Sequence, residues 1–262
     1  MKIQSIEIKK FIVKVICLPF IGQLLSIVFN NKFSSKGIFI FTDSEFINNK
    51  TKASIFWGLY EKAEIHFVRK YLNPDCDVIE LGSSIGIVSS HIITKLNNNR
   101  KIICVEGNPY LIDILKKNIQ HNSNQKAFFI ENKIIDYRLS TSSYINISKN
   151  NTDSNITSSS KNQTPVKNIK LSNLIEQYYI EHFTLVSDIE GAEALILKND
   201  SSSLKNCKMI IIELHDSIID GSITNTKQLG EMILMLNFQI LDKRNNVWVL
   251  INNKYLGEIR EY

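Results

Sequence analysis

Two carboxylates and two glycines near the middle of the chain have the types and spacing of a nucleoside-binding site. An apolar run ends at Glu80, Gly82 and Gly86 follow, and about 20 residues later a second apolar run ends at Glu106. In doubly wound sheets such glycines let the backbone approach a ligand, and the acid on the second strand accepts hydrogen bonds from ribose hydroxyls. The pattern predicts a nucleoside-binding site in which the small Ser84 lines the loop.

The loop composition favours S-adenosylmethionine over a dinucleotide. A pyrophosphate loop usually reads G-x-G-x-x-G, whereas this loop lacks the middle glycine and follows an acid. The Glu80 carboxylate would repel a pyrophosphate, but it suits the cationic amino-acid end of S-adenosylmethionine, reached through water. The alternative is that Gly82 and Gly86 serve only the close packing of a strand, a turn and a helix.

A second acidic group follows two later apolar runs. Asp188 and Glu190 come just past one run, and Glu213 and His215 come just past the next. Ligands collect at the carboxyl ends of parallel strands, so we expect these side chains to be neighbours. Methyl transfer to a hydroxyl requires removal of a proton, and histidine has a suitable intrinsic pKa. His215 is therefore the predicted general base, unless it is a turn histidine bonded to a backbone carbonyl.

Asp188 has three predicted roles in this group. It could orient His215, bind the amino end of the cofactor, or help to hold a cation. Three carboxylates and a histidine could bind a divalent cation. No metal site is expected, however, and S-adenosylmethionine is the expected cofactor.

These motifs resemble those of the FkbM-type methyltransferases over roughly residues 56–250. The matching segments are the glycine loop, the E-x-N-P turn, the D-I-E-G-A-E block, the E-L-H segment and a helix start, at 80–86, 106–109, 188–193, 213–215 and 170–175. The resemblance implies an S-adenosylmethionine-dependent, mostly O-methylating enzyme, of a kind often found with polysaccharide or natural-product biosynthesis. It also implies cofactor contacts at Glu106 and Asn108.

The chain departs from the family pattern at two points. The family loop more often begins with Asp and continues Gly-Ala-Asn, whereas this chain has Glu80 and then serines after Gly82. Ser187 stands where a lysine often precedes Asp188, so no role for that lysine can be transferred.

The apolar runs alternate with helical patterns, which predicts an α/β fold. Strands are expected at 77–81, 102–106, 127–131, 184–188 and 209–213, and a closing antiparallel hairpin at 238–241 and 247–251. An amphipathic helix is expected over 51–72. Together with the resemblance, this order predicts a doubly wound, Rossmann-like class I methyltransferase sheet, mostly parallel, with an N-terminal helical extension. The predicted parts are an extension at 1–50 and a methyltransferase domain at 51–262. The Ser-, Asn- and Thr-rich segment 140–168 is expected to be a polar, mobile loop.

The positive charge of the chain is concentrated at its N-terminus. The chain has a net charge of +5, and residues 1–36 hold six lysines against Glu7, giving 6 − 1 = +5, so the remainder is neutral. The apolar run 11–29 within this segment is too interrupted to span a membrane. Such a segment could lie on an anionic membrane surface, at the inner face of the membrane. Helices that pack on the domain or on a second subunit of an oligomer are the alternative.

The remaining composition narrows the function classes. Four cysteines are scattered singly, which indicates neither a disulfide framework nor a zinc site and fits a cytoplasmic protein. A neutral remainder without an N-P-P-Y tetrapeptide argues against nucleic acid as partner. The prediction is methylation of a sugar, polysaccharide or small-molecule hydroxyl. The alternatives are an NAD-dependent Rossmann-type oxidoreductase and a methyltransferase acting on protein or nucleic acid.

Overall fold

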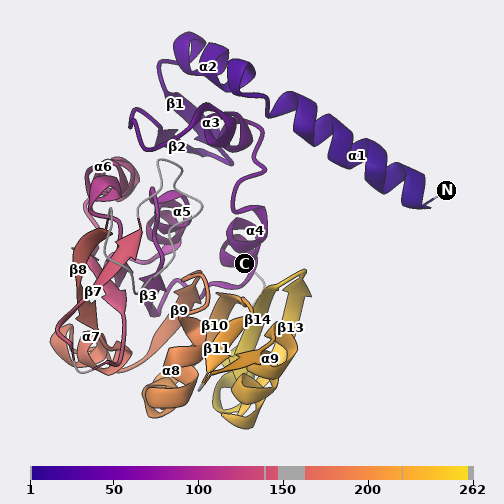
Figure 1. Cartoon of the computed structure of the whole chain (residues 1–262). Coiled ribbons are helices and arrows are strands. Elements are labelled where there is room, and N and C mark those ends of the chain that lie inside the picture. Colours follow the sequence, from indigo (N-terminus) through magenta and orange to yellow (C-terminus); the bar gives the residue numbers. More distant parts are fainter. Residues whose placement is uncertain (1, 139, 147–162, 220, 259–262) are drawn as a thin grey trace.

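The computed structural model describes residues 2–138, 140–146, 163–219 and 221–258. A seven-stranded sheet forms the centre of the molecule (Figure 1). Its strand order is β13-β14-β10-β9-β3-β4-β5. β14 pairs antiparallel with its neighbours β13 and β10. The five strands β10, β9, β3, β4 and β5 are parallel to one another. The strands are β3 (Asp77–Leu81), β4 (Lys101–Val105), β5 (Ala127–Glu131), β9 (Phe183–Ser187), β10 (Cys207–Glu213), β13 (Phe238–Arg244) and β14 (Val247–Asn252). The predicted mostly parallel sheet with a closing hairpin is confirmed.

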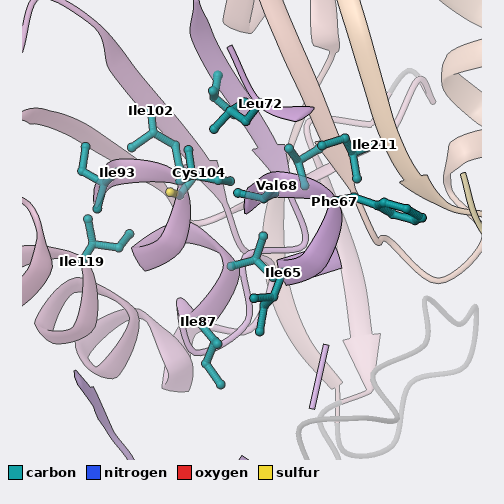
Figure 2. Close-up of a cluster of buried hydrophobic side chains, with 14 of the residues drawn as sticks. Ile65, Phe67, Val68, Leu72, Ile87, Ile93, Ile102, Cys104, Ile119 and Ile211 are labelled. Atoms are coloured by element: carbon teal, nitrogen blue, oxygen red, sulfur yellow. The ribbon is translucent and has the colours of Figure 1, made fainter. Parts of the chain in front are cut away.

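Helices cover both faces of this sheet because its central strands are apolar on both sides. All five residues of β3 and of β9 are buried, the pattern of a parallel strand covered on two faces. One buried cluster joins β4 and β10 to α4 (Lys62–Tyr71), α5 (Ile87–Lys95) and α6 (Ile112–Asn122) (Figure 2). The other joins the opposite face to α7 (Leu171–Gln177), α8 (Glu193–Asn199) and α9 (Thr226–Met235). Along β10, Met209 and Ile211 enter the first cluster, whereas Ile210 and Ile212 enter the second.

The single helix predicted over 51–72 is wrong. The chain forms α3 (Asn49–Phe56) and α4, separated by residues 57–61. Gly58 and Glu61 both have positive φ angles, of 62° and 46°, which a continuous helix does not allow. The break turns Tyr60 and Glu61 toward the carboxyl ends of the parallel strands.

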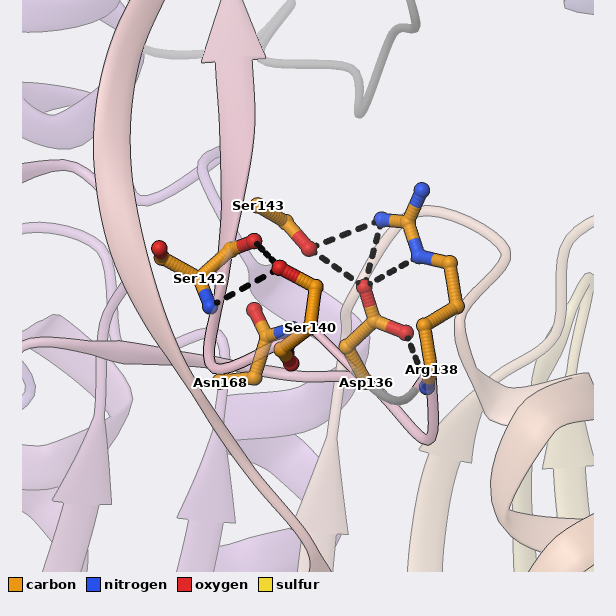
Figure 3. Close-up of polar contacts among 6 residues, drawn as sticks. All are labelled: Asp136, Arg138, Ser140, Ser142, Ser143 and Asn168. Atoms are coloured by element: carbon orange, nitrogen blue, oxygen red, sulfur yellow. Dashed lines mark hydrogen bonds and ion pairs between the residues drawn. The ribbon is translucent and has the colours of Figure 1, made fainter.

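The predicted loop over 140–168 is wrong at both flanks. Strands β6 (Lys133–Ile135), β7 (Ser142–Asn146) and β8 (Gln163–Ile169) form a separate sheet in the order β6-β8-β7. The Asp136 carboxylate fixes the β6–β7 connection, since it accepts hydrogen bonds from Arg138 Nε (2.7 Å) and Ser143 Oγ (2.6 Å) (Figure 3). The middle of the segment, 147–162, lies outside the described residues.

The N-terminal extension consists of two helices and a hairpin. They are α1 (Lys2–Ile16), α2 (Pro19–Val28), β1 (Lys32–Ser35) and β2 (Ile38–Phe41), and α1 extends away from the body of the molecule (Figure 1). α2 packs closely on α3, since a Cβ atom at Gly22 would lie 1.7 Å from the Asn49 carbonyl oxygen. No helix in the described ranges has the length and apolarity needed to cross a bilayer.

Shorter elements complete the described chain. The hairpin β11 (Ser217–Ile219) and β12 (Ser222–Thr224) follows β10. Three short 3₁₀ turns are present: η1 (Pro109–Leu111), η2 (Ser201–Asn206) and η3 (Asn253–Glu258).

Asn118 fastens the extension to the domain, which generates a stability prediction. Its buried side chain accepts a hydrogen bond from the Phe41 amide (2.7 Å) and donates to the carbonyl oxygens of Phe41 (3.1 Å) and Ile85 (2.8 Å). Asn118→Leu would leave these buried backbone groups without partners, so we expect the free energy of unfolding to fall by about 3 kcal/mol. Urea denaturation followed by circular dichroism measures this change. The control Asn122→Ala, one turn later on the same helix and less buried, should cost under about 1 kcal/mol; equal losses would contradict the proposed role of Asn118.

Candidate active site

A cavity of ≈ 250 Å³ lies at the carboxyl ends of β3, β4 and β9. The loops that follow these strands supply one wall, and the α3–α4 connection, β6 and β7 supply the rest. Ligands of open α/β sheets bind at this edge. The lining residues are Tyr60, Glu61, Gly82, Ser84, Val105, Glu106, Gly107, Asn108, Leu111, Lys133, Ile134, Ile135, Ile145, Asp188, Ile189, Glu190 and Ala192.

Glu106 is held rigidly at one end of the cavity. Its two carboxylate oxygens accept hydrogen bonds from the backbone amides of Ser84 and Asn108, both at 2.7 Å. Burial raises the pKa of Glu106, and these amides oppose that rise. Each carboxylate oxygen has a further lone pair, so the group can also accept hydrogen bonds from a pair of ribose hydroxyls.

Asn108 offers a donor in the same part of the cavity. Its Oδ1 accepts a hydrogen bond from the Tyr110 amide (3.0 Å), which fixes the side chain. Its buried Nδ2 has no partner among the residues that the structure describes. Since an unpaired buried donor is costly, this Nδ2 is suited to a ligand acceptor such as a nucleoside nitrogen or oxygen.

The two glycines of the loop are required mainly by protein neighbours. Gly82 has φ +83°, and a Cβ atom there would lie 1.8 Å from the Asp188 carbonyl oxygen. Gly86 has φ +81° at the start of α5, and its Cβ would lie 2.8 Å from Leu115 Cδ1. Gly82 lines the cavity, but Gly86 does not. Both glycines are therefore needed for close packing, and Gly82 also lies where a ligand could approach the backbone. The two interpretations do not exclude each other.

Glu80 lies beneath the loop instead of in the main cavity. Its buried carboxyl accepts a hydrogen bond from Ser89 Oγ, and burial raises its pKa to about 7. It lines a second cavity of ≈ 20 Å³ together with Ser83, Asp188 and others. That volume is enough for one water molecule, so the predicted water-mediated contact from Glu80 to a ligand remains open to test.

The structure brings together the four predicted catalytic side chains. His215 Nε2 lies 3.6 Å from Glu190 Oε2, 3.8 Å from Asp188 Oδ1 and 4.0 Å from Glu213 Oε1. The expectation that the residues after β9 and β10 are neighbours agrees with these distances. His215 and Glu213 do not line the main cavity, however, whereas Asp188 and Glu190 do.

Glu193 is a site residue to which the sequence reasoning gave no role. Its fully buried carboxylate lies 3.5 Å from His215 Nδ1 and accepts hydrogen bonds from the amides of Ile189 (3.0 Å) and Gly191 (2.8 Å). Glu193 therefore fixes both the loop that carries Asp188 and the ring of His215. The available signal was an acid at the first position of a helix, five residues after another site acid.

The surroundings of His215 favour its protonated form. The ion pair with Glu193, supported by Asp188 and Glu190, raises the pKa of His215 to about 9. A group must be deprotonated to accept a proton, and the intrinsic pKa of histidine, about 6.5, does not describe this ring. The role of His215 as general base therefore stays a prediction, which the intrinsic pKa of histidine alone does not support.

The pKa of Asp188 is raised as well, but in this case burial is the main cause. Burial and the neighbouring Glu213 carboxylate raise the pKa of Asp188 to about 8, although His215 opposes that rise. One ligand atom each from Asp188, Glu213 and His215 all lie within 4.8 Å of one another, so a divalent cation could bind once His215 is neutral.

Tyr60 and Glu61 line another part of the cavity. The Tyr60 hydroxyl lies 3.4 Å from Ser84 Oγ, and Glu61 sits in the left-handed backbone region. Burial, then Glu64, Asp188 and Glu80, raise the pKa of Glu61 well above its usual range. This rise favours the neutral form of the Glu61 carboxyl, which can donate a hydrogen bond into the cavity.

Comparison with protein families identifies a match for most of this domain. The family model described as the methyltransferase FkbM domain matches residues 81–245, which include every loop of the cavity that follows a parallel strand. No curated protein matches the chain.

Solved structures resemble the chain only at low sequence identity. Fibrillarin from Aeropyrum pernix, with natively bound S-adenosyl-L-methionine, is 13% identical, with a TM-score of 0.37 over 67% of this chain and 65% of that chain. The chain thus spans slightly less than two thirds of that protein. The Methanococcus jannaschii fibrillarin, a pre-rRNA processing protein, is 16% identical, with a TM-score of 0.41 over 73% of this chain and 74% of that chain. These likenesses are too distant to carry an argument about acceptor or partner.

The Glu193–His215 ion pair predicts a linked titration. The pKa of His215 is raised in the folded state, so its stabilising effect is fully present below about pH 6.5 and is lost as the pH rises through about 9. Glu193→Gln should move the His215 pKa down toward its usual value, and NMR of the imidazole carbons measures it. The control Glu231→Gln, on an exposed helical pair with Lys227, should leave it unchanged. A His215 pKa near 6.5 in the unaltered protein would contradict the assignment.

Proposed function

Because the chain belongs to the FkbM methyltransferase family and is an S-adenosylmethionine-dependent methyltransferase, we propose that it methylates a hydroxyl oxygen of a sugar, a polysaccharide or another small molecule. The observation that carries this proposal is the set of carboxyl groups in one cavity: Glu61, Asp188 and Glu190 face the same space as Glu106. Carboxyl groups make hydrogen bonds with hydroxyls, of which a sugar offers several.

The same cavity disfavours phosphate-rich acceptors. The lysine among its described lining residues, Lys133, forms an ion pair of 2.8 Å with Glu131. A cavity lined by several carboxyl groups disfavours phosphates, and outside residues 1–36 the chain is neutral. We therefore propose that the acceptor is not a nucleic acid.

The cofactor-binding role is proposed for the Glu106 end of the cavity. Glu106 would accept hydrogen bonds from the ribose hydroxyls, and Asn108 Nδ2 would donate a hydrogen bond to the base. The loop that contains Gly82 and Ser84 would lie beneath the ligand. Glu80 and Asp188 would stabilise the positively charged end of the cofactor. When bound, S-adenosylmethionine supplies the methyl group on a sulfonium, whose sulfur keeps the electron pair of the broken bond.

Proton removal is proposed for Asp188. The acceptor hydroxyl must lose its proton as its oxygen forms the new bond, and a carboxylate within the cavity can accept that proton. Asp188 lines the cavity and lies 3.8 Å from His215 Nε2. Because its pKa is raised to about 8, it can accept the proton only as its carboxylate, a form that the cationic cofactor would favour. Neutral Glu61 would donate a hydrogen bond that positions the acceptor.

We propose a cytoplasmic location for the enzyme. The four cysteines are all free and buried. Unpaired cysteines at scattered positions fit a reducing compartment.

Removing Glu106 should weaken cofactor binding. Glu106→Ala removes a charge-assisted acceptor for two ribose hydroxyls, so we expect the affinity for S-adenosylmethionine to fall by roughly 1.5–3 kcal/mol. Isothermal titration calorimetry measures this loss. The control is Glu176→Ala, which removes an exposed acid of α7 that does not line the cavity. Equal affinities for the unaltered protein and Glu106→Ala would place the nucleoside site elsewhere.

The pH dependence of turnover distinguishes Asp188 from His215 as base. If Asp188 accepts the proton, kcat should rise with pH and level off at or below about pH 8, because the cationic cofactor lowers the Asp188 pKa. Asp188→Asn should lower kcat by roughly 10²–10⁴-fold and abolish this rise. A panel of mono- and oligosaccharides is the acceptor set, and S-adenosylhomocysteine formation is the readout. A rise near pH 9 that Glu193→Gln moves to lower pH would instead assign the base to His215.

A chelator tests the cation alternative in the same assay. If turnover needs no metal, added EDTA leaves kcat unchanged in the unaltered enzyme. Loss of activity with EDTA, restored by Mg²⁺ or Mn²⁺, would show that Asp188, Glu213 and His215 hold a cation and would overturn the metal-independent mechanism.

A further inference from the structure

The two N-terminal helices expose aligned apolar side chains to solvent. On α1, Ile8, Phe11, Ile12 and Val15 recur at the spacing of one helical face and are all exposed, with Phe11 at 67%. Exposed apolar side chains that share one face over two helical turns mark an interaction surface.

The second helix, α2, packs on α3 through one face and exposes apolar side chains on the other. Gly22 and Ser26 of α2 are buried toward α3, whereas Phe20, Leu24 and Ile27 remain exposed, with Ile27 at 72%. The exposed side is therefore not the result of an undocked helix. We define the α1–α2 apolar surface by seven of the exposed apolar side chains of the two helices: Ile8, Phe11, Ile12, Val15, Phe20, Leu24 and Ile27.

Positive charge accompanies this surface. Residues 1–36 carry the full net charge of +5, and the lysines at 9, 10 and 14 lie within α1 itself. A self-complementary contact between two copies would place two such segments against each other, at an electrostatic cost. A negatively charged partner with an apolar interior satisfies both the charge and the exposed side chains.

We propose that the α1–α2 apolar surface binds the surface of an anionic lipid bilayer. A basic amphipathic helix lies in the plane of the interface, with its apolar face at the boundary of headgroups and acyl chains and its lysines among anionic headgroups. α1 has 15 residues and is about 22 Å long, enough for such a contact. Trp57, which donates a hydrogen bond to the Ile16 carbonyl oxygen (3.0 Å), ties the end of α1 to the α3–α4 connection.

Vesicle flotation of the full chain tests the proposal. We expect binding to vesicles of phosphatidylcholine with phosphatidylglycerol, and little binding to phosphatidylcholine alone. Raising the salt from 0.1 to 1 M shortens the screening length from about 10 to about 3 Å, so it should release the protein. Replacement of Lys9, Lys10 and Lys14 by Gln should weaken binding about a hundredfold, at about fivefold per charge.

Apolar substitutions separate membrane insertion from simple charge attraction. The double variant Phe11→Ser/Phe20→Ser should lower the partition constant at least tenfold for each ring, roughly. The matched control Tyr179→Ser/Met235→Ser changes two side chains of 89% and 84% exposure on other parts of the molecule, and it should bind as the unaltered protein does. All of these residues are exposed, so circular dichroism and the melting temperature should show intact folding.

Three results would overturn the proposal. One is equal vesicle binding by the Phe11→Ser/Phe20→Ser variant and the control. Another is equal binding to neutral and anionic vesicles. The third is absence of vesicle binding together with a concentration-dependent dimer, in analytical ultracentrifugation, that the Phe11→Ser/Phe20→Ser variant loses; this would assign the surface to a second copy. None of these measurements requires methyl transfer, so they are independent of the acceptor.

Discussion

The site depends on backbone hydrogen bonds that continue the parallel sheet past the ends of its strands. The Gly82 amide donates to the Val105 carbonyl oxygen (2.9 Å), and the Asp188 amide donates to the Leu81 carbonyl oxygen (2.9 Å). These bonds draw the three loops together so closely that no side chain fits at position 82. One constraint thus sets Glu106, Gly82 and Asp188 in a row along one wall, and the cavity follows from it.

The close approach of these loops also concentrates negative charge. Asp188, Glu190, Glu193 and Glu213 all lie within ion-pair distance of one histidine. Burial is the main cause that raises the pKa values of Asp188, Glu61 and Glu80, and the neighbouring carboxylates add to the rise. A cationic ligand relieves this repulsion and an anionic one increases it. The same charge distribution agrees with S-adenosylmethionine as the cofactor and is the basis on which a hydroxyl acceptor was proposed.

The sequence predicted the features that depend on local pattern. Apolar runs that end on an acid located β3, β4, β9 and β10, and the strand order then placed their terminal acids together. The break at 57–61 was missed because Phe56, Tyr60, Ala63, Phe67 and Tyr71 keep a helical period across it, and most of them face the same core. The flanks of the polar segment 140–168 were missed because only a few of their side chains, such as Ile145 and Val166, are buried apolar residues. The amino-acid composition of a segment does not show whether it pairs with a strand elsewhere in the chain.

The chemistry of His215 was the part least accessible from sequence. Its intrinsic pKa suggested a base, but the buried Glu193 carboxylate that changes its protonation comes into range only through the turn at 189–191. The pKa of a side chain depends on the groups that surround it in the folded protein. The sequence named these residues but did not show that they surround His215.

The extension and the cavity share a short structural connection. α2 packs on α3, and the residues that follow α3 lead within a few positions to Tyr60 and Glu61 in the cavity wall. Asn118 joins β2 to the glycine loop through the carbonyl oxygen of Ile85. Removal of residues 1–36 would therefore uncover the packed side of α3 and take away β1, the strand that pairs with β2. The side chains of the α1–α2 apolar surface do not line the cavity, so substitutions there separate the contribution of the surface from that of the fold, which a truncation cannot do.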